Sequence, residues 1–378
     1  MPRNTSTSPD AGLFAGIASG DWNAHNRRAN PFTDHRFLQA LTATASVRPE
    51  TGWTDLSAAF AAGDAFAPVW SKTNSHGEFV FDFAWADAAR RAGLRWYPKL
   101  LVAAPVTPVT GPRLLGRDDH ARRALVQRLA DAVESQEYSC CSVNFCDDVD
   151  ASILDESGWL ERCDWQYHWF NDGYRDFDDF LDRLRSKPRK NIRRERRLAH
   201  ADGWRFRWLD GRTATDEELR TVHDCYRTTF MLYGNLPSLN LAFFARTARE
   251  FGAQFLVCMA SRNDEDLACS VFWKNDTRLF GRYWGARTET RDVHFEACYY
   301  QGIEYCIRHG LDAFEPGAQG EHKIRRGFVP VRTRSYHYIR HPALREGIRR
   351  WLDMERRALD QYRDELRGIE PYRKAVET

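Results

Sequence analysis

The stretch from Gln254 to Trp284, QFLVCMASRNDEDLACSVFWKNDTRLFGRYW, decides the fold. It holds three runs of β-prone residues, separated by the short polar breaks Asn263-Asp264 and Lys274-Asn275-Asp276. Short polar breaks between such runs are typical of turns that join antiparallel strands. We therefore predict three successive antiparallel strands over 254–260, 267–273 and 277–284.

Helical patterns flank these strands on both sides. Apolar residues recur at helical spacing over 215–233 and 239–251 before the strands, and over 293–307 after them. Gly310 follows the last pattern at the position where a glycine commonly ends a helix. A short strand at 311–314 and a β-rich run after Phe328 complete the order.

A polar segment lies between that short strand and the β-rich run. It reads FEPGAQGEHKIRRGF over Phe314–Phe328 and combines carboxylates, an amide, a histidine and three cations with several small residues. Nothing in the segment indicates core packing, and loops at such positions commonly carry functional groups. We therefore expect it to form part of a site, and a plain surface turn is the alternative.

The second informative stretch is strongly basic. Nine Lys or Arg residues stand against one acid, Glu195, from Arg183 to Arg197, and Pro188 is placed in the first turn of a helix. A solvated helix face normally alternates the sign of its charges. The density therefore favours anion binding, to the phosphates of RNA or of a cofactor tail, over a merely exposed basic face. No pattern for sequence-specific nucleic-acid readout accompanies it.

The first half of the chain gives weaker signals. Four prolines interrupt the β-prone run over 96–112, which predicts an edge strand or an extended wall instead of a central strand. A helix is expected over 118–135, with strands at 141–145 and 165–169. The last part of the chain has an amphipathic pattern typical of a long helix.

Size and composition indicate an ordinary globular protein. With 378 residues, 43% hydrophobic and 29% charged, the chain is long enough for two domains. A net charge of +2 does not favour wholesale coating of nucleic acid, and no DNA partner is expected. The start of the chain lacks a secretory signal pattern, and no apolar stretch has the length of a membrane span, so we expect a cytoplasmic protein with no integral membrane segment. The nine cysteines lack metal-site spacing and are interpreted as reduced core residues, with no metal expected.

Six motifs together resemble one protein family. They are TGW at 51–53, the single run over 97–115 that contains YPKL and TPVTGPRLL, KPRKNIRRERR at 187–197, GRYWGA at 281–286, HFEACYYQGIEYCI at 294–307 and EPGAQGEHKIRRGF at 315–328. The chain resembles the Fem-like, peptidoglycan-biosynthesis-type N-acyltransferases of the GNAT superfamily over nearly its whole length. The resemblance implies an α/β (α+β) fold with tandem GNAT-like domains, mixed and mostly antiparallel sheets flanked by helices, and a long C-terminal helix.

The resemblance also implies domain limits. We expect a flexible N-terminus over 1–16, a first GNAT-like domain over 17–172, and a second over 173–340 that carries a basic helical hairpin at 183–201. A C-terminal amphipathic helix then occupies 341–378.

The resemblance leaves two acyl donors open. Fem-type relatives use aminoacyl-tRNA, whereas ordinary GNAT enzymes bind acyl-CoA through a glycine-rich loop. The corresponding stretch here, ARTETRDVH over 286–294, has no glycine, which favours aminoacyl-tRNA. Arg287 and Arg291 keep a smaller phosphorylated donor open. No tightly bound cofactor is expected beyond the co-substrate.

Amide formation needs a base, a proton donor and groups that hold the substrates. The residues predicted for catalysis are Glu321, His322, Glu315, Tyr283 and Tyr300. Those predicted to bind a small-molecule or peptide amine acceptor are Gln319, Glu296 and Trp284. Those predicted to bind donor phosphates are Lys190, Arg193, Arg194, Arg197, Arg282, Lys323 and Arg325. The alternative of a different class is a GNAT-like protein that binds a ligand without turnover.

Overall fold

The computed structural model describes residues 17–290, 292–318 and 320–373. The expected flexible N-terminus at 1–16 lies outside the described residues. The chain divides into two compact units. Unit 1 comprises Met1–Cys163 and Arg334–Met354, and unit 2 comprises Asp164–Thr333 and Glu355–Thr378. The expected domain limits at 17–172, 173–340 and 341–378 stay a prediction.

Unit 1 is built on a mixed sheet with helices packed on it. Its strands follow the order β1-β3-β4-β6-β13, and only β4 and β6 run parallel. A separate small ladder joins β2 and β5. The elements are α1 (Ser19–Ala24), η1 (Arg27–Ala29), α2 (His35–Ala43), η2 (Pro49–Thr51), β1 (Trp53–Asp55), α3 (Ser57–Phe60), β2 (Ala65–Phe66), β3 (Val69–Lys72), α4 (Phe83–Arg91), β4 (Lys99–Val102), β5 (Leu115–Gly116), α5 (Asp119–Glu134), β6 (Cys140–Asn144) and α6 (Asp148–Glu156).

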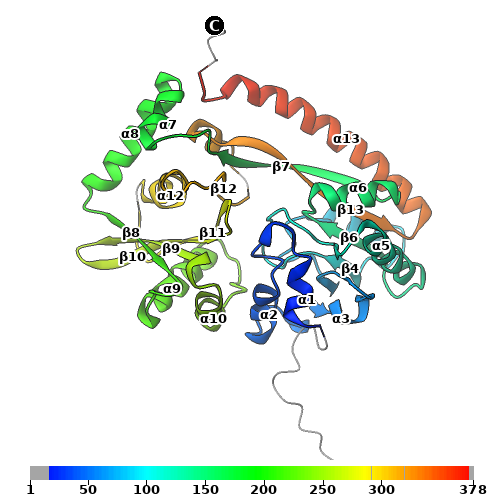
Figure 1. The fold of residues 1–378 in the computed structure, drawn as a ribbon. Coiled ribbons are helices and arrows are strands. Elements are labelled where there is room, and N and C mark those ends of the chain that lie inside the picture. The colour runs from blue at the N-terminus through cyan, green and yellow to red at the C-terminus, as the bar shows by residue number, and fades with distance from the viewer. Residues whose placement is uncertain (1–16, 291, 319, 374–378) are drawn as a thin grey trace, which may run out of the picture. The chain divides into compact units, whose positions relative to one another are not determined.

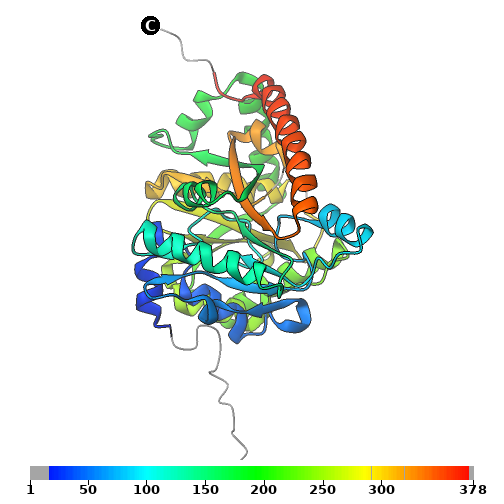
Figure 2. The same ribbon diagram turned by 90° about the vertical axis from the view of Figure 1, so that its right-hand side faces the viewer.

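The core of unit 1 lies between its sheet and α5. Leu125, Leu129 and Val133 of this helix are buried against the strand residues Val102 and Val143. Asp118 starts the helix because its carboxylate accepts the backbone N–H of Ala121. In Figure 2, α5, in teal, lies in front of the unit 1 strands.

Unit 2 contains the strands from which the fold was predicted. Their order is β7-β12-β11-β10-β9-β8, and only β11 and β12 run parallel. The elements are α7 (Phe177–Arg183), α8 (Ser186–Ala201), β8 (Arg205–Asp210), α9 (Asp216–Leu232), α10 (Leu241–Phe251), η3 (Gly252–Gln254), β9 (Phe255–Arg262), β10 (Glu265–Lys274), β11 (Arg278–Ala286), α11 (Val293–Phe295), the π-helical turn η4 (Glu296–Tyr300), α12 (Gln301–His309), β12 (Ala313–Glu315), η5 (Glu321–Arg326) and η6 (Arg367–Ile369). Three elements cross the limits between the units, namely β7 (Leu160–Phe170), β13 (Val329–Ile339) and α13 (Pro342–Leu366).

The sheet of unit 2 is covered on both faces. Helix α12 lies on one face of β9–β11, while α9 and α10 lie on the other (Figure 1). Gly285 allows α9 to come close to β11, because a Cβ at this position would lie 1.9 Å from the carbonyl oxygen of Cys225. Gly310 adopts a left-handed conformation, with φ of 64°, and ends α12 as expected. The predicted α/β fold with mostly antiparallel strands and a long C-terminal helix is confirmed.

Two local expectations were wrong. β4 pairs with β3 on one side and β6 on the other, so it is not an edge strand. The prolines of the 96–112 run lie outside the four residues that pair, which is why they are tolerated. The segment after β12 is also not purely polar, because Ile324 and Phe328 are fully buried in the core of unit 2.

Candidate active site

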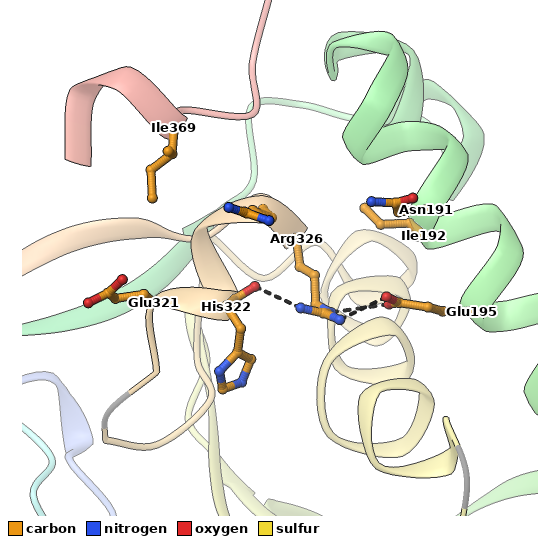
Figure 3. Close-up of a pocket in the computed structure, with 8 residues that line it drawn as sticks. Asn191, Ile192, Glu195, Glu321, His322, Arg326 and Ile369 are labelled. Atoms are coloured by element: carbon orange, nitrogen blue, oxygen red, sulfur yellow. Dashed lines mark hydrogen bonds and ion pairs between the residues drawn. The ribbon is translucent and has the colours of Figure 1, made fainter. Parts of the chain in front are cut away.

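A pocket of about 350 Å³ opens in unit 2 between α8 and η5. Asn191, Ile192 and Glu195 face it from α8, and Glu321, His322, Arg325 and Arg326 face it from η5, with Ile369 of η6 closing one side (Figure 3). The pocket therefore combines residues from the basic helix with residues from the polar segment. These are the two stretches that the sequence singled out.

One wall of the pocket is a closed network around Glu195. Arg326 donates to both carboxylate oxygens, at 2.8 Å from Nη2 and 3.2 Å from Nε, and the hydroxyl of Tyr300 donates to the same carboxylate. Arg326 also donates to the carbonyl oxygen of His322, at 2.8 Å, and lies 3.6 Å over the ring of Phe295. Burial raises the pKa of Tyr300. The polar groups of Arg326 and Tyr300 thus hydrogen-bond within the wall of the pocket.

Glu321 and His322 point in different directions from η5 (Figure 3). Oε1 of Glu321 accepts a hydrogen bond from the hydroxyl of Tyr362, and Oε2 makes none among the described residues. Nε2 of His322 lies 3.0 Å from the hydroxyl of Tyr299. Burial lowers the pKa of His322, and Arg326 lowers it further. At neutral pH the pocket therefore presents an unprotonated imidazole, which can accept a proton from an ammonium, and the side chain of Glu321 offers a second candidate base.

Lys323 binds the backbone of the polar segment. Its ammonium is buried, with an exposed fraction of 2%, and donates to the carbonyl oxygens of Gly317 at 2.7 Å and Ala318 at 3.0 Å. Burial lowers the pKa of Lys323 to about 7. Its contacts are to the backbone of the segment, so it holds the loop that leads into the pocket.

This burial gives a testable dependence of stability on pH. Between pH 7 and 10.5 the unfolded chain binds a proton at Lys323 that the folded chain has largely released. The free energy of unfolding should therefore gain a contribution that rises with pH over this window, by up to about 1.4 kcal/mol per pH unit. Lys323→Met should lack this contribution, and denaturant unfolding at both ends of the window measures it. Equal pH dependence of wild type and variant would refute the assignment.

The cations of α8 separate into paired and unpaired ones. Arg189 pairs with Asp182, Arg193 with Asp178, and Arg196 with Glu296 and Glu304. Four others are exposed and make no ion pair or hydrogen bond among the described residues; they are Lys187, Lys190, Arg194 and Arg197. Their spacing of three, four and three residues puts them on one face of the helix. We call these four residues the cationic face of α8.

Several residues predicted for the site lie elsewhere in unit 2. Glu296 is fully buried on Arg196, and Glu315 is buried with Arg278 at 2.9 Å. The ring of Tyr283 packs 5.1 Å from that of Tyr226, and burial raises its pKa.

Two further predicted residues, Arg282 and Trp284, also do not line the pocket. Arg282 and Trp284 lie on β11, where Trp284 packs 5.3 Å from the ring of His294. Gln319 lies outside the described residues, as does Arg291. Of the predicted phosphate-binding residues, only Arg325 both lines the pocket and is exposed without an ion pair or hydrogen bond among the described residues.

Sequence reasoning missed part of the pocket. Glu195 had a visible signal, because it is the single acid in a cation-rich helix. Ile369, and Tyr362, which contacts Glu321, had none. Both belong to the C-terminal segment, which is far from the polar segment's other partners in sequence and in which only packing was expected.

Within unit 2, the parallel pair β11–β12 in an otherwise antiparallel sheet with helices on both faces is the arrangement expected from the resemblance to GNAT-like domains. The chain belongs to the FemAB-like family, described as peptidoglycan biosynthesis/recognition, whose model matches residues 14–374. The resemblance predicted from the six motifs is thus confirmed. No curated protein matches the sequence.

Three solved structures show the same fold. FemX has a TM-score of 0.55 at 11% identity, with 88% of this chain and 98% of that chain covered. The C-terminal domain of a lysylphosphatidylglycerol synthetase from Agrobacterium fabrum has a TM-score of 0.54 at 10% identity, covering 87% and 93%. L-PGS from Bacillus licheniformis has a TM-score of 0.50 at 11% identity, covering 84% and 91%.

Proposed function

We propose that this FemAB-like acyltransferase forms an amide by transferring an aminoacyl group from aminoacyl-tRNA to an amine acceptor, in the cytoplasm, and that the reaction takes place at the α8–η5 pocket. The observation that carries the proposal is that α8 bears the cationic face and also supplies Asn191, Ile192 and Glu195 to the pocket that holds Glu321 and His322. Two of the structures that share the fold are named for the synthesis of lysylphosphatidylglycerol, which is itself an aminoacyl ester.

The residues suggest a division of roles. The side chain of Glu321, or the neutral ring of His322, accepts a proton from the acceptor ammonium. The freed amine attacks the ester carbonyl of the donor, the new C–N bond forms, and the ester C–O bond breaks with return of a proton to the ribose oxygen. Arg325, which is exposed at the pocket, stabilises the negative charge that develops or holds a donor phosphate.

The cationic face of α8 suits a nucleic-acid donor. Backbone phosphates are bound by Lys and Arg without reading of bases, and each contact releases counterions. An acyl-CoA donor is the competing candidate, but Arg287, one of the two arginines in the stretch where GNAT enzymes carry their phosphate-binding loop, already pairs with Asp224 at 2.8 Å. We prefer tRNA because the cationic face of α8 makes no ion pairs among the described residues, whereas Arg287 is paired.

A binding measurement tests the donor assignment. Lys190→Gln combined with Arg194→Gln should weaken binding of charged tRNA, and the slope of log K against log salt should become shallower by roughly 1 for each lost phosphate contact. Arg220→Gln combined with Arg227→Gln is the matched control, because these two exposed arginines of α9 also lack ion pairs among the described residues. An unchanged affinity and slope in the α8 variant would remove the support for a tRNA donor.

A further inference from the structure

An exposed apolar tip stands at the end of α9. Its large side chains are strongly exposed, with exposed fractions of 63% for Met231, 78% for Leu232, 78% for Tyr233 and 91% for Leu236. Leu236 is the most exposed large hydrophobic residue in the described part of the chain. Four exposed large side chains therefore lie within six residues. Isolated exposed apolar residues are common in soluble proteins, but such a concentration indicates a contact surface.

The tip is a defined structure and does not collapse onto the body of unit 2. The N–H of Gly234 donates to the carbonyl oxygen of Met231 at 3.0 Å, and that of Asn235 to Phe230 at 2.9 Å. On its far side the chain is anchored by Leu239, which is buried and whose N–H donates to the hydroxyl of Tyr226. The apolar side chains are therefore held outward between two fixed points.

Positive charge accompanies the apolar tip. Arg220, Arg227 and Met231 are seven and four residues apart and share one face of α9. Both arginines are exposed and make no ion pair or hydrogen bond among the described residues. Of the acids on this face, Asp224 is already paired with Arg287, while Glu217 stands a turn before Arg220, away from the tip.

We propose that this tip, residues 231–236 with Arg220 and Arg227, anchors the protein to an anionic lipid surface. A lipid bilayer can deform around apolar side chains that project from a loop. A rigid protein partner would instead need a matching pocket for each side chain. Tyr233 suits the interfacial region, where its ring is half-immersed, and the arginines complement anionic headgroups. The proposed contact is peripheral, since the tip alone makes it. In the described part of the chain, none of the helices qualifies as a membrane span.

Vesicle sedimentation tests the proposal on the full chain. The protein should bind vesicles of equal parts phosphatidylcholine and phosphatidylglycerol, and bind vesicles of phosphatidylcholine alone much more weakly. Leu232→Ser combined with Leu236→Ser should lower the partition coefficient about tenfold, because two apolar insertions are lost. Arg220→Gln and Arg227→Gln should each lower it about fivefold and flatten its salt dependence. Met354→Ser, at an exposed apolar position of α13, is the matched control and should bind as wild type does.

A probe on the tip separates insertion from general attraction. An environment-sensitive dye attached to Tyr233→Cys, in a Cys163→Ser background, should shift to an apolar signal on the mixed vesicles and not on neutral ones. The other eight cysteines are buried, which limits unwanted labelling. No shift, or vesicle binding that depends only on Lys190 and Arg194 of α8, would overturn the proposal. So would light scattering that shows the leucine variants converting a dimer to a monomer, because the partner would then be a second copy of the chain.

This inference stands apart from the proposed reaction. The leucine and arginine variants of the tip should transfer acyl groups between soluble substrates at the wild-type rate, since none of these residues lines the pocket. Vesicle binding without transferase activity, or the reverse, therefore shows which of the two proposals fails.

Discussion

Glu321→Gln is expected to lower kcat about 100-fold while leaving the affinity for the donor nearly unchanged. The substitution keeps the size of the side chain and its ability to accept the hydrogen bond from Tyr362 through the amide oxygen. It removes the basic oxygen that faces the pocket. A single-turnover transfer assay, run beside a donor-binding titration, separates the chemical step from binding.

Two comparisons make this result decisive. Glu365→Gln changes an exposed glutamate of α13 outside the pocket and should leave kcat unaltered. His322→Gln tests the other candidate base in the same assay. A loss confined to the His322 variant would assign the proton transfer to the imidazole. Donor binding without turnover in the wild-type protein would instead support the alternative of a non-catalytic binder.

Arg326→Met is expected to lower the free energy of unfolding by about 3 kcal/mol. The side chains of Arg326 and Glu195 are only 11% and 13% exposed, so removing the cation leaves a mostly buried carboxylate without its partner. The contacts to the hydroxyl of Tyr300, at 3.0 Å, and to the ring of Phe295 are lost together with it. Denaturant unfolding with a common m-value measures the difference.

The controls for this prediction use the same residue types. Arg349→Met breaks an ion pair with Glu346 of the same length, 2.8 Å, whose partners are 54% and 46% exposed, and should change stability by less than about 0.5 kcal/mol. Adding Glu195→Met to Arg326→Met removes the orphaned charge and should restore part of the loss. If Arg326→Met were as stable as wild type, the buried ion pair between Arg326 and Glu195 would not stabilise the fold, which would contradict the prediction.

The fold was predictable because local signals agreed over long stretches. The strands over 254–284 have β-prone runs and turn residues in register, and Gly310 marks the helix end that its left-handed conformation requires. The prediction of an edge strand over 96–112 was wrong because the prolines lie outside the strand, and β4 ends before most of them. Propensity identifies an element more reliably than its limits.

The site was predictable only in outline. Glu321 and His322 were found because a dense run of polar residues has few structural uses. The partners that define the pocket lie far away in sequence, with Glu195 separated from Arg326 by 131 residues and from Tyr300 by 105. A basic helix likewise does not reveal from its sequence which cations pair. That depends on acids such as Glu296, which tertiary packing brings to Arg196.

The most direct test of the account is transfer of labelled acyl groups from aminoacyl-tRNA and from acyl-CoA, supplied side by side to the purified protein with a pool of amines. The account predicts that label passes from aminoacyl-tRNA into an amide, that ribonuclease abolishes this transfer, and that Glu321→Gln slows it about 100-fold. Transfer from acyl-CoA that survives ribonuclease, with none from charged tRNA, would contradict it.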